Sequence, residues 1–121
     1  MENKKSILQE KSYAFAIRIV RLSQFLQETQ REFVLNKQIL KSGTAIGALI
    51  REAEFAQSNA DYINKFSISL KEANESAYWL SLLKDTDYID VKLYDSFSCD
   101  CNELISILVS TIKTLKLRTK N

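Results

Sequence analysis

The sequence of 121 residues contains no proline and only two glycines, and this shortage of turn-forming residues limits the fold more than any other feature. An average protein contains about 5% proline and about 7% glycine. A chain with so few turn formers has few turns, so its secondary-structure elements must be few and long. This excludes most all-β folds. We therefore expect an all-α protein that forms a single domain over residues 1–121.

Both glycines lie in one stretch, Leu35–Ala53, which has the spacing of a long helix. The sequence Ser42-Gly43-Thr44 falls inside this helical pattern and follows no strand, so it does not indicate a phosphate-binding loop. A glycine inside a helix costs about 1 kcal/mol relative to alanine. Two of them, Gly43 and Gly47, therefore indicate that this helix packs closely against another, with Thr44 as a further small residue between them.

Apolar residues that recur at steps of three and four predict four helices, over about 8–28, 29–57, 58–85 and 90–120. Thr29 and Glu32 match a capping box, Ser58 or Asn59 can cap the third helix, and Asp90 can cap the last. Long helices with short connections favour an antiparallel up-down-up-down four-helix bundle. The predicted core line of the first helix is Phe15, Ile19, Leu22 and Leu26, and that of the third is Ile63, Phe66, Leu70, Ala73, Ala77 and Leu80.

Two further lines of residues extend beyond this core. Tyr13, Ile17 and Val20 run beside the core line of the first helix. They form either an unusually broad core contact or a subunit interface, and we favour the interface. On the third helix, two carboxylates stand between large apolar residues, in the line Ile68, Glu72, Glu75, Trp79 and Leu82, and Lys71 can pair with Glu75 at a spacing of four.

The net charge of +2 is unevenly distributed along the chain. Residues 1–51 carry nine Lys and Arg against four acids, residues 52–103 carry four against eleven, and residues 104–121 carry four against none. Pairing of oppositely charged helices, within the bundle or between subunits, explains this asymmetry, as does the preference of a helix C-terminus for cations. The other explanation is phosphate binding, for which the candidates are Arg18, Arg21, Lys37, Lys41, Lys113, Lys116, Arg118 and Lys120.

The residue types argue against an enzyme. Histidine is absent, which excludes a Glu-x-x-His di-metal site and any Ser-His or Cys-His nucleophile pair. Glu52, Glu72 and Glu75 could hold a hard cation, but acids at helix contacts more often pair with Lys or Arg, so we expect no metal and no cofactor. Cys99 and Cys101 lie on opposite faces of a helix and cannot form a disulfide. Free thiols, together with the lack of a signal peptide or a long apolar run, predict a soluble cytoplasmic protein that does not enter a membrane.

Two long segments resemble the 23S rRNA intervening-sequence proteins, small bacterial four-helix bundles also described as a ribosomal protein family. Residues 38–53, QILKSGTAIGALIREA, match one block, and residues 61–80, DYINKFSISLKEANESAYWL, match a second. Residues 12–16 and 103–116 also fit, so the resemblance covers nearly the whole chain. The motif residues to which it assigns a structural role are Ser42, Gly43, Thr44, Gly47, Glu52, Lys71, Glu72, Glu75 and Trp79.

The match departs from the family at two positions. The family usually has arginine where this chain has Lys41, so a planar, forked contact is not expected there. It usually has asparagine in place of Leu49, so any hydrogen bond made at that position in relatives is missing.

The resemblance implies a homo-oligomer, a pentameric ring of bundles, that binds structured RNA or DNA. A related branch resembles the accessory protein of reverse transcriptases in diversity-generating retroelements. The alternative function is therefore a scaffold that binds a partner protein such as a reverse transcriptase. A ring would repeat each basic patch, so a modest charge per subunit could sum to a useful affinity.

Overall fold

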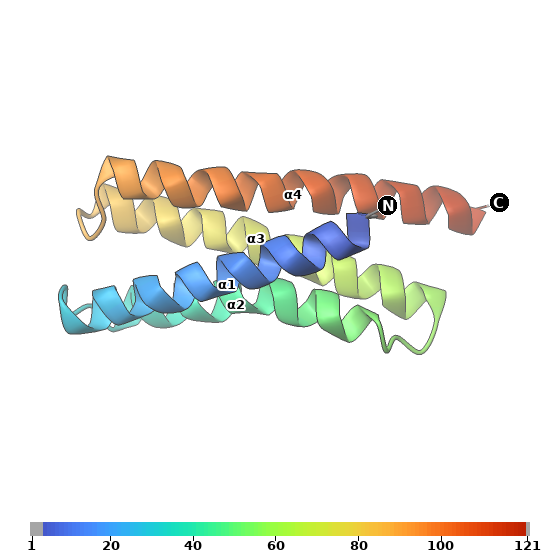
Figure 1. Cartoon of the computed structure of the whole chain (residues 1–121), viewed down its shortest axis with the longest axis horizontal. Coiled ribbons are helices and arrows are strands. Elements are labelled where there is room, and N and C mark those ends of the chain that lie inside the picture. The colour runs from blue at the N-terminus through green and yellow to red at the C-terminus, as the bar shows by residue number, and fades with distance from the viewer. Residues whose placement is uncertain (1–3, 121) are drawn as a thin grey trace.

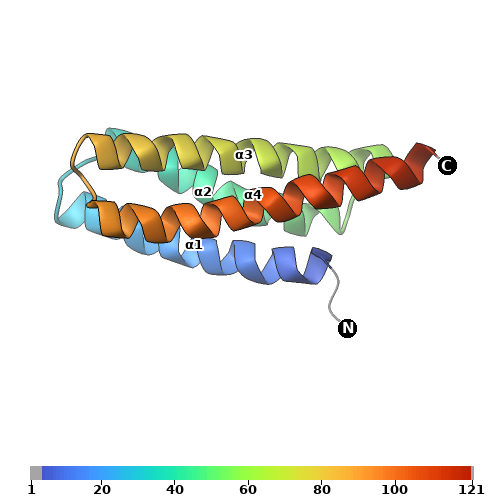
Figure 2. The same cartoon turned by 90° about the horizontal axis from the view of Figure 1, so that it is seen from above.

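Four helices follow one another through the chain in a computed structural model that describes residues 4–120: α1 (Lys4–Glu28), α2 (Val34–Ala53), α3 (Asn59–Asp85) and α4 (Val91–Lys120). Each helix runs antiparallel to the next (Figure 1). Seen from above, α4 returns beside α1 and closes the bundle (Figure 2). The contact between α1 and α4 is the least extensive of the four helix contacts. The predicted all-α, up-down-up-down four-helix bundle is confirmed.

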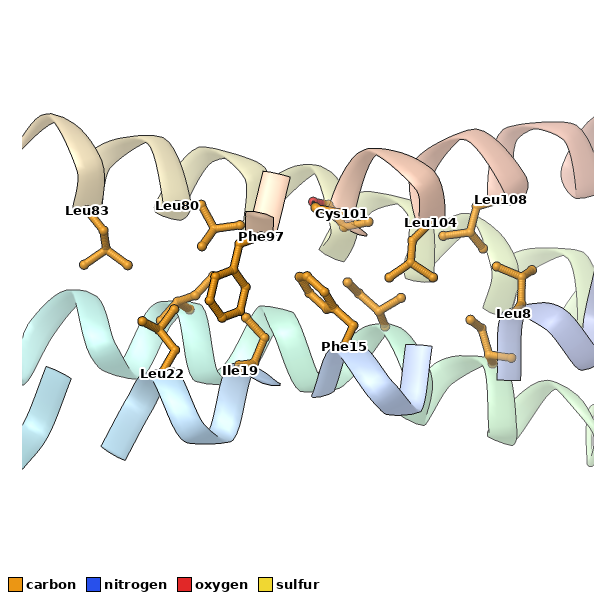
Figure 3. Close-up of a cluster of buried hydrophobic side chains, with 14 of the residues drawn as sticks. Leu8, Phe15, Ile19, Leu22, Leu80, Leu83, Phe97, Cys101, Leu104 and Leu108 are labelled. Carbon is orange, nitrogen blue, oxygen red and sulfur yellow. The ribbon is translucent and has the colours of Figure 1, made fainter. Parts of the chain in front are cut away.

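The apolar lines of the helices meet in one core (Figure 3). The predicted core line of α1 is correct, because Phe15, Ile19, Leu22 and Leu26 are all buried. The rings of Phe15 and Phe97 pack edge to face with centroids 6.3 Å apart, which joins α1 to α4 in the middle of the bundle. Cys101 is buried beside them and Cys99 is exposed, so the two thiols point apart as predicted.

The predicted core line of α3 is correct only in part, because Phe66, Ala73 and Leu80 are buried but Ile63 is not. Ser69 and Ser76 are fully buried, whereas Leu70 and Ala77 are only half-buried. Ser69 Oγ donates a hydrogen bond to the carbonyl of Ile46 at 2.9 Å. Ser76 Oγ lies 3.0 Å from Ser42 Oγ, to which it donates. Small hydroxyl side chains that find partners across the contact allow α2 and α3 to approach closely, so burial costs these serines little.

The capping box predicted at Thr29 and Glu32 is not formed, and α2 begins at Val34. The backbone NH groups of Thr29 and Glu32 instead donate to the carbonyls of Phe25 (2.9 Å) and Leu26 (2.8 Å), which terminates α1. Arg31 adopts a positive φ of 55° in this turn, a position that glycine usually takes at the end of a helix. The carboxylate of Glu32 does stabilise α2, since it accepts a hydrogen bond from the NH of Asn36 at 2.9 Å.

The other two predicted caps are correct. Ser58 Oγ accepts from the NH of Asp61 at 3.1 Å and caps α3. Asp90 Oδ1 accepts from the NH of Leu93 at 2.8 Å and caps α4. α2 ends at Ala53, earlier than the predicted end near residue 57, and α1 begins at Lys4, earlier than the predicted start near residue 8.

Candidate interaction surfaces

Arg18 is held inside the protein's own α1–α4 contact. Its guanidinium donates to Asp100 Oδ2 at 2.7 Å and to Ser96 Oγ at 2.9 Å. The same group lies 4.1 Å from the centre of the Phe97 ring, close enough for a cation–π interaction. Together with the ion pair between Lys11 and Glu103 at 3.2 Å, this contact ties the basic first helix to the acidic part of α4. Arg18 therefore has partners within the protein itself, and its contact with phosphate stays a prediction.

Three of the other basic candidates lie on the outer surface of α1 and α2. Arg21, Lys37 and Lys41 are exposed, and within residues 4–120 they form no ion pair. The sequence reasoning missed Arg51, which is exposed on the same outer line of α2. The signal was present, because the outward positions of α2 repeat at steps of four and three. This line consists of Lys37, Lys41, Thr44, Ala48, Arg51 and Phe55, and we call it the outer line of α2.

The remaining basic candidates lie at the opposite end of the bundle. Lys113, Lys116 and Arg118 are exposed on the last turns of α4. Lys120 is the last residue of the helix, and its side chain lies outside what the structure describes. The end of α4 extends beyond the turn between α2 and α3 (Figure 1). The structure therefore divides the basic candidates between two separate surfaces.

A groove of about 660 Å³ lies between α1 and α2 on their outer side. Tyr13 and Phe55 stand beside it with 64% and 80% of their surfaces exposed. Its floor is formed by small residues, among them Ala16, Gly47 and Ala48. A second hollow, of about 370 Å³, continues along α1 and shares Tyr13 and Ala16 with the groove; it also includes Ile17, Val20, Arg21 and Gln24.

The two glycines of α2 face α1. A Cβ atom at Gly43 would come within 2.7 Å of Ile19 Cγ1 and 2.9 Å of Ile19 Cγ2. A Cβ atom at Gly47 would lie 3.1 Å from Ser12 Oγ. Thr44, between them, donates a hydrogen bond to the carbonyl of Leu40 at 2.7 Å and lines the groove. The close approach of α1 and α2 therefore depends on the absence of a Cβ atom at Gly43 and Gly47.

Of the three acids that could hold a cation, Glu72 and Glu75 lie together and Glu52 lies apart from them. Glu52 forms an ion pair with Lys65 at 3.3 Å, near the turn between α2 and α3. Glu72 and Glu75 lie next to each other in the middle of α3; partial burial raises the pKa of Glu72, and the neighbouring charge of Glu75 raises it further. Lys71 forms no ion pair with Glu75 within residues 4–120, contrary to the prediction. No group of three potential metal ligands occurs among these residues.

Two aromatic residues follow the carboxylates on α3. Trp79 is half-buried against the core, and the Tyr78 ring packs edge to face on it with centroids 5.0 Å apart. Tyr78 itself is 59% exposed. The outer side of α3 therefore presents the Tyr78 ring one helical turn after the exposed carboxylate of Glu75.

The two cysteines should react at very different rates with a thiol reagent. Cys101 is buried, its thiol donates to the carbonyl of Ala73 at 3.3 Å, and burial raises its pKa to about 11. At pH 8 we expect one thiol of the native protein, Cys99, to be modified quickly and the second only on unfolding, because the thiolate is the reactive form. Titration with a chromogenic disulfide reagent measures this, and a Cys99→Ser variant should lose the fast phase. A fast phase that survives in that variant would contradict the buried position of Cys101.

Comparison with known proteins supports the assignment from the sequence. The family model of the 23S rRNA-intervening sequence protein matches residues 4–110. The chain belongs to this family. The match ends before the basic residues at the end of α4, so the 23S rRNA-intervening sequence proteins do not by themselves account for Lys113, Lys116 and Arg118.

A solved structure shows the same fold. It is that of a protein with unknown function from the S23 ribosomal protein family of Bacteroides thetaiotaomicron, and it is 55% identical to this chain with a TM-score of 0.90. The alignment covers 92% of this chain and 99% of that one. No curated protein matches the sequence. Across residues 4–120, no helix is both long and apolar enough to cross a membrane.

Proposed function

We propose that this protein is a non-enzymatic homo-oligomer that binds structured RNA through the basic end of α4. The observation that carries this proposal is the local charge. Lys113, Lys116 and Arg118 are exposed on the last turns of α4, and residues 104–121 contain no acid. Phosphate groups are the natural counterions of such a segment, and they bind it with little dependence on base sequence.

Oligomerisation would supply the affinity that one helix end lacks. Three or four phosphate contacts give weak binding at physiological salt, and several tethered copies of the same patch raise the overall affinity through effective concentration. The exposed apolar residues Tyr13, Ile17 and Val20 on α1 support self-association, because soluble monomers seldom expose a continuous apolar surface of this kind. Arg21 and Lys37 could add further phosphate contacts on the α1–α2 surface.

Removal of the three cations should weaken RNA binding and also its dependence on salt. In the triple variant Lys113→Gln, Lys116→Gln, Arg118→Gln, the slope of log K against log salt should fall by about 2 to 3, since each phosphate contact contributes about 0.7–0.9. Fluorescence anisotropy with a labelled stem-loop RNA, at salt concentrations between about 50 and 200 mM, measures the slope.

The matched control replaces Lys71 and Lys92, which are also exposed but lie away from the end of α4, with Gln. This variant should keep nearly the full slope. The proposal that the end of α4 binds RNA is wrong if the wild-type protein retains no RNA at low salt. It is also wrong if the slope falls as much in the control as in the triple variant.

The same exposed apolar residues of α1 also favour the alternative function, a scaffold for a partner protein such as a reverse transcriptase. Affinity purification from the native host before and after nuclease digestion separates the two. A partner protein that stays bound after digestion supports the scaffold, whereas one that is released with the RNA supports the proposed function.

A further inference from the structure

A hollow of about 300 Å³ lies beside the basic end of α4, between the last turns of α4 and the first turns of α3. The residues that line it are Asn59, Tyr62 and Ile63 on α3 and Leu115, Arg118 and Thr119 on α4. Its volume is at the lower end of the range for small-molecule sites, so the hollow suits one flat ring rather than a helix. Arg118 belongs both to this hollow and to the basic residues proposed to bind phosphate.

The polar side chains at the hollow have no partners within the part of the chain that the structure describes. Arg118 forms no ion pair there, and the side-chain amide of Asn59 forms no hydrogen bond. Asp61, in the same turn of α3, does not line the hollow, and its carboxylate accepts a hydrogen bond from the NH of Gln57 at 3.1 Å. The hollow therefore offers a positive charge together with an amide that can both donate and accept.

The remaining wall of the hollow is apolar and includes an aromatic ring. Tyr62 is half-buried, and its ring packs edge to face on the buried ring of Phe66 with centroids 5.0 Å apart, which holds it in place. Ile63 and Leu115 are half-buried and also line the hollow. An aromatic ring, a guanidinium group and an amide are the groups with which proteins bind unpaired bases, by stacking and by hydrogen bonds to the base edge.

We propose that this hollow binds one unpaired base of the RNA, with its ring against Tyr62, its edge at Asn59 and a neighbouring phosphate at Arg118. The inference rests on the proposed binding of RNA by the end of α4, and it specifies which part of a structured RNA is bound. A hairpin loop or a bulge offers such a base, whereas a continuous duplex offers mainly phosphates and 2′-hydroxyl groups. The protein therefore distinguishes a stem-loop from a duplex of the same stem.

Two labelled RNA probes with the same stem, one closed by an unpaired loop and one fully paired, test this preference. The wild-type protein should bind the stem-loop at least about fivefold more tightly than the duplex, which is the lower end of what one stacked base contributes. Tyr62→Leu should remove this preference, and Asn59→Ala should reduce it. Fluorescence anisotropy at several salt concentrations measures the affinities for both probes.

The dependence on salt separates a base contact from a phosphate contact. Tyr62→Leu and Asn59→Ala remove no charge, so they should lower the affinity for the stem-loop and leave the slope of log K against log salt unchanged. Arg118→Gln should instead lower the slope by about 0.7–0.9. Tyr62→Phe restores the ring, so it should recover most of the affinity that Tyr62→Leu loses, which excludes a general effect on folding.

The matched controls are Asn64→Ala and Tyr78→Leu, because both replace exposed residues of α3 that lie outside the hollow. They should keep the preference for the stem-loop. If the wild-type protein binds both probes equally, or if Tyr62→Leu and Asn59→Ala keep its affinity for the stem-loop, the base site is wrong and RNA binding by the end of α4 still stands. A slope that falls in Tyr62→Leu as it does in Arg118→Gln would also refute the base contact. If neither probe is retained at low salt, the proposed function fails as well.

Discussion

Truncation of Phe15 to alanine should destabilise the protein by about 3–5 kcal/mol, because it empties the centre of the core. Phe15 is 1% exposed, and its ring packs against Phe97 in the middle of the bundle (Figure 3). Domains of this size have a free energy of unfolding of about 5–15 kcal/mol, so the loss is a large share of the total. Urea denaturation followed by circular dichroism measures the change.

The position of Phe15 also predicts where the structure loosens. The α1–α4 contact is the least extensive in the bundle, and Phe15 with Phe97 lies at its centre. Amide hydrogen exchange in Phe15→Ala should therefore increase in α1 more than in α2 and α3. Phe25→Ala is the matched control, since this ring on the same helix is 38% exposed and its loss should cost less than about 1 kcal/mol. Equal losses at the two positions would contradict the described core.

The helical fold could be predicted because its determinants are local. The absence of proline and the spacing of apolar residues are visible in any short window, and Ser58 and Asp90 cap the helices where the sequence places them. The capping box predicted at Thr29 was wrong because the same polar residue types occur at the start and at the end of a helix. In the turn that terminates α1, Arg31 adopts a positive φ. The residue type arginine does not predict a positive φ, so this turn could not be recognised from the sequence.

The candidate interaction surfaces could be predicted only in part, because they depend on which helices become neighbours. The exposed line of Tyr13, Ile17 and Val20 follows from the spacing on α1 alone. The partner of Arg18 does not, since Asp100 is 82 residues away in the sequence. The groove likewise requires α1 and α2 side by side, and Phe55 enters it from a position just beyond the end of α2.

The buried serines of α3 show a third limit to predicting the structure from the sequence. A reading based on hydrophobicity places Leu70 and Ala77 in the core, because serine counts as polar. In the bundle, the approach of α2 to α3 leaves room only for small side chains, and hydrogen bonds to Ile46 and Ser42 satisfy the hydroxyls of Ser69 and Ser76. The cost of burying a polar group depends on its partner, which only the assembled structure provides.

The contact between Gly43 and Ile19 should show strong energetic coupling. Gly43→Ala adds a Cβ that would meet two inner carbons of the Ile19 side chain at 2.7 and 2.9 Å. Ile19 is fully buried and branched at Cβ, so it cannot turn aside, and α1 must shift. Overpacking of this kind costs about 1–3 kcal/mol, more than the roughly 1 kcal/mol that alanine gains over glycine in a helix. Gly43→Ala should therefore lower the free energy of unfolding in urea denaturation.

The sign of this effect should reverse when the opposing side chain is removed. Ile19→Ala alone should cost about 2–5 kcal/mol through the cavity it leaves, and Gly43→Ala added to it should recover about 1 kcal/mol, because the new methyl group enters empty space and favours the helix. The double-mutant cycle would then give a coupling of about 2 kcal/mol. Gly47→Ala is the matched control: its Cβ would meet Ser12 Oγ at 3.1 Å, a contact that a small shift relieves, so its effect should stay within about 1 kcal/mol. Additive costs in the cycle would mean that Gly43 does not set the distance between α1 and α2.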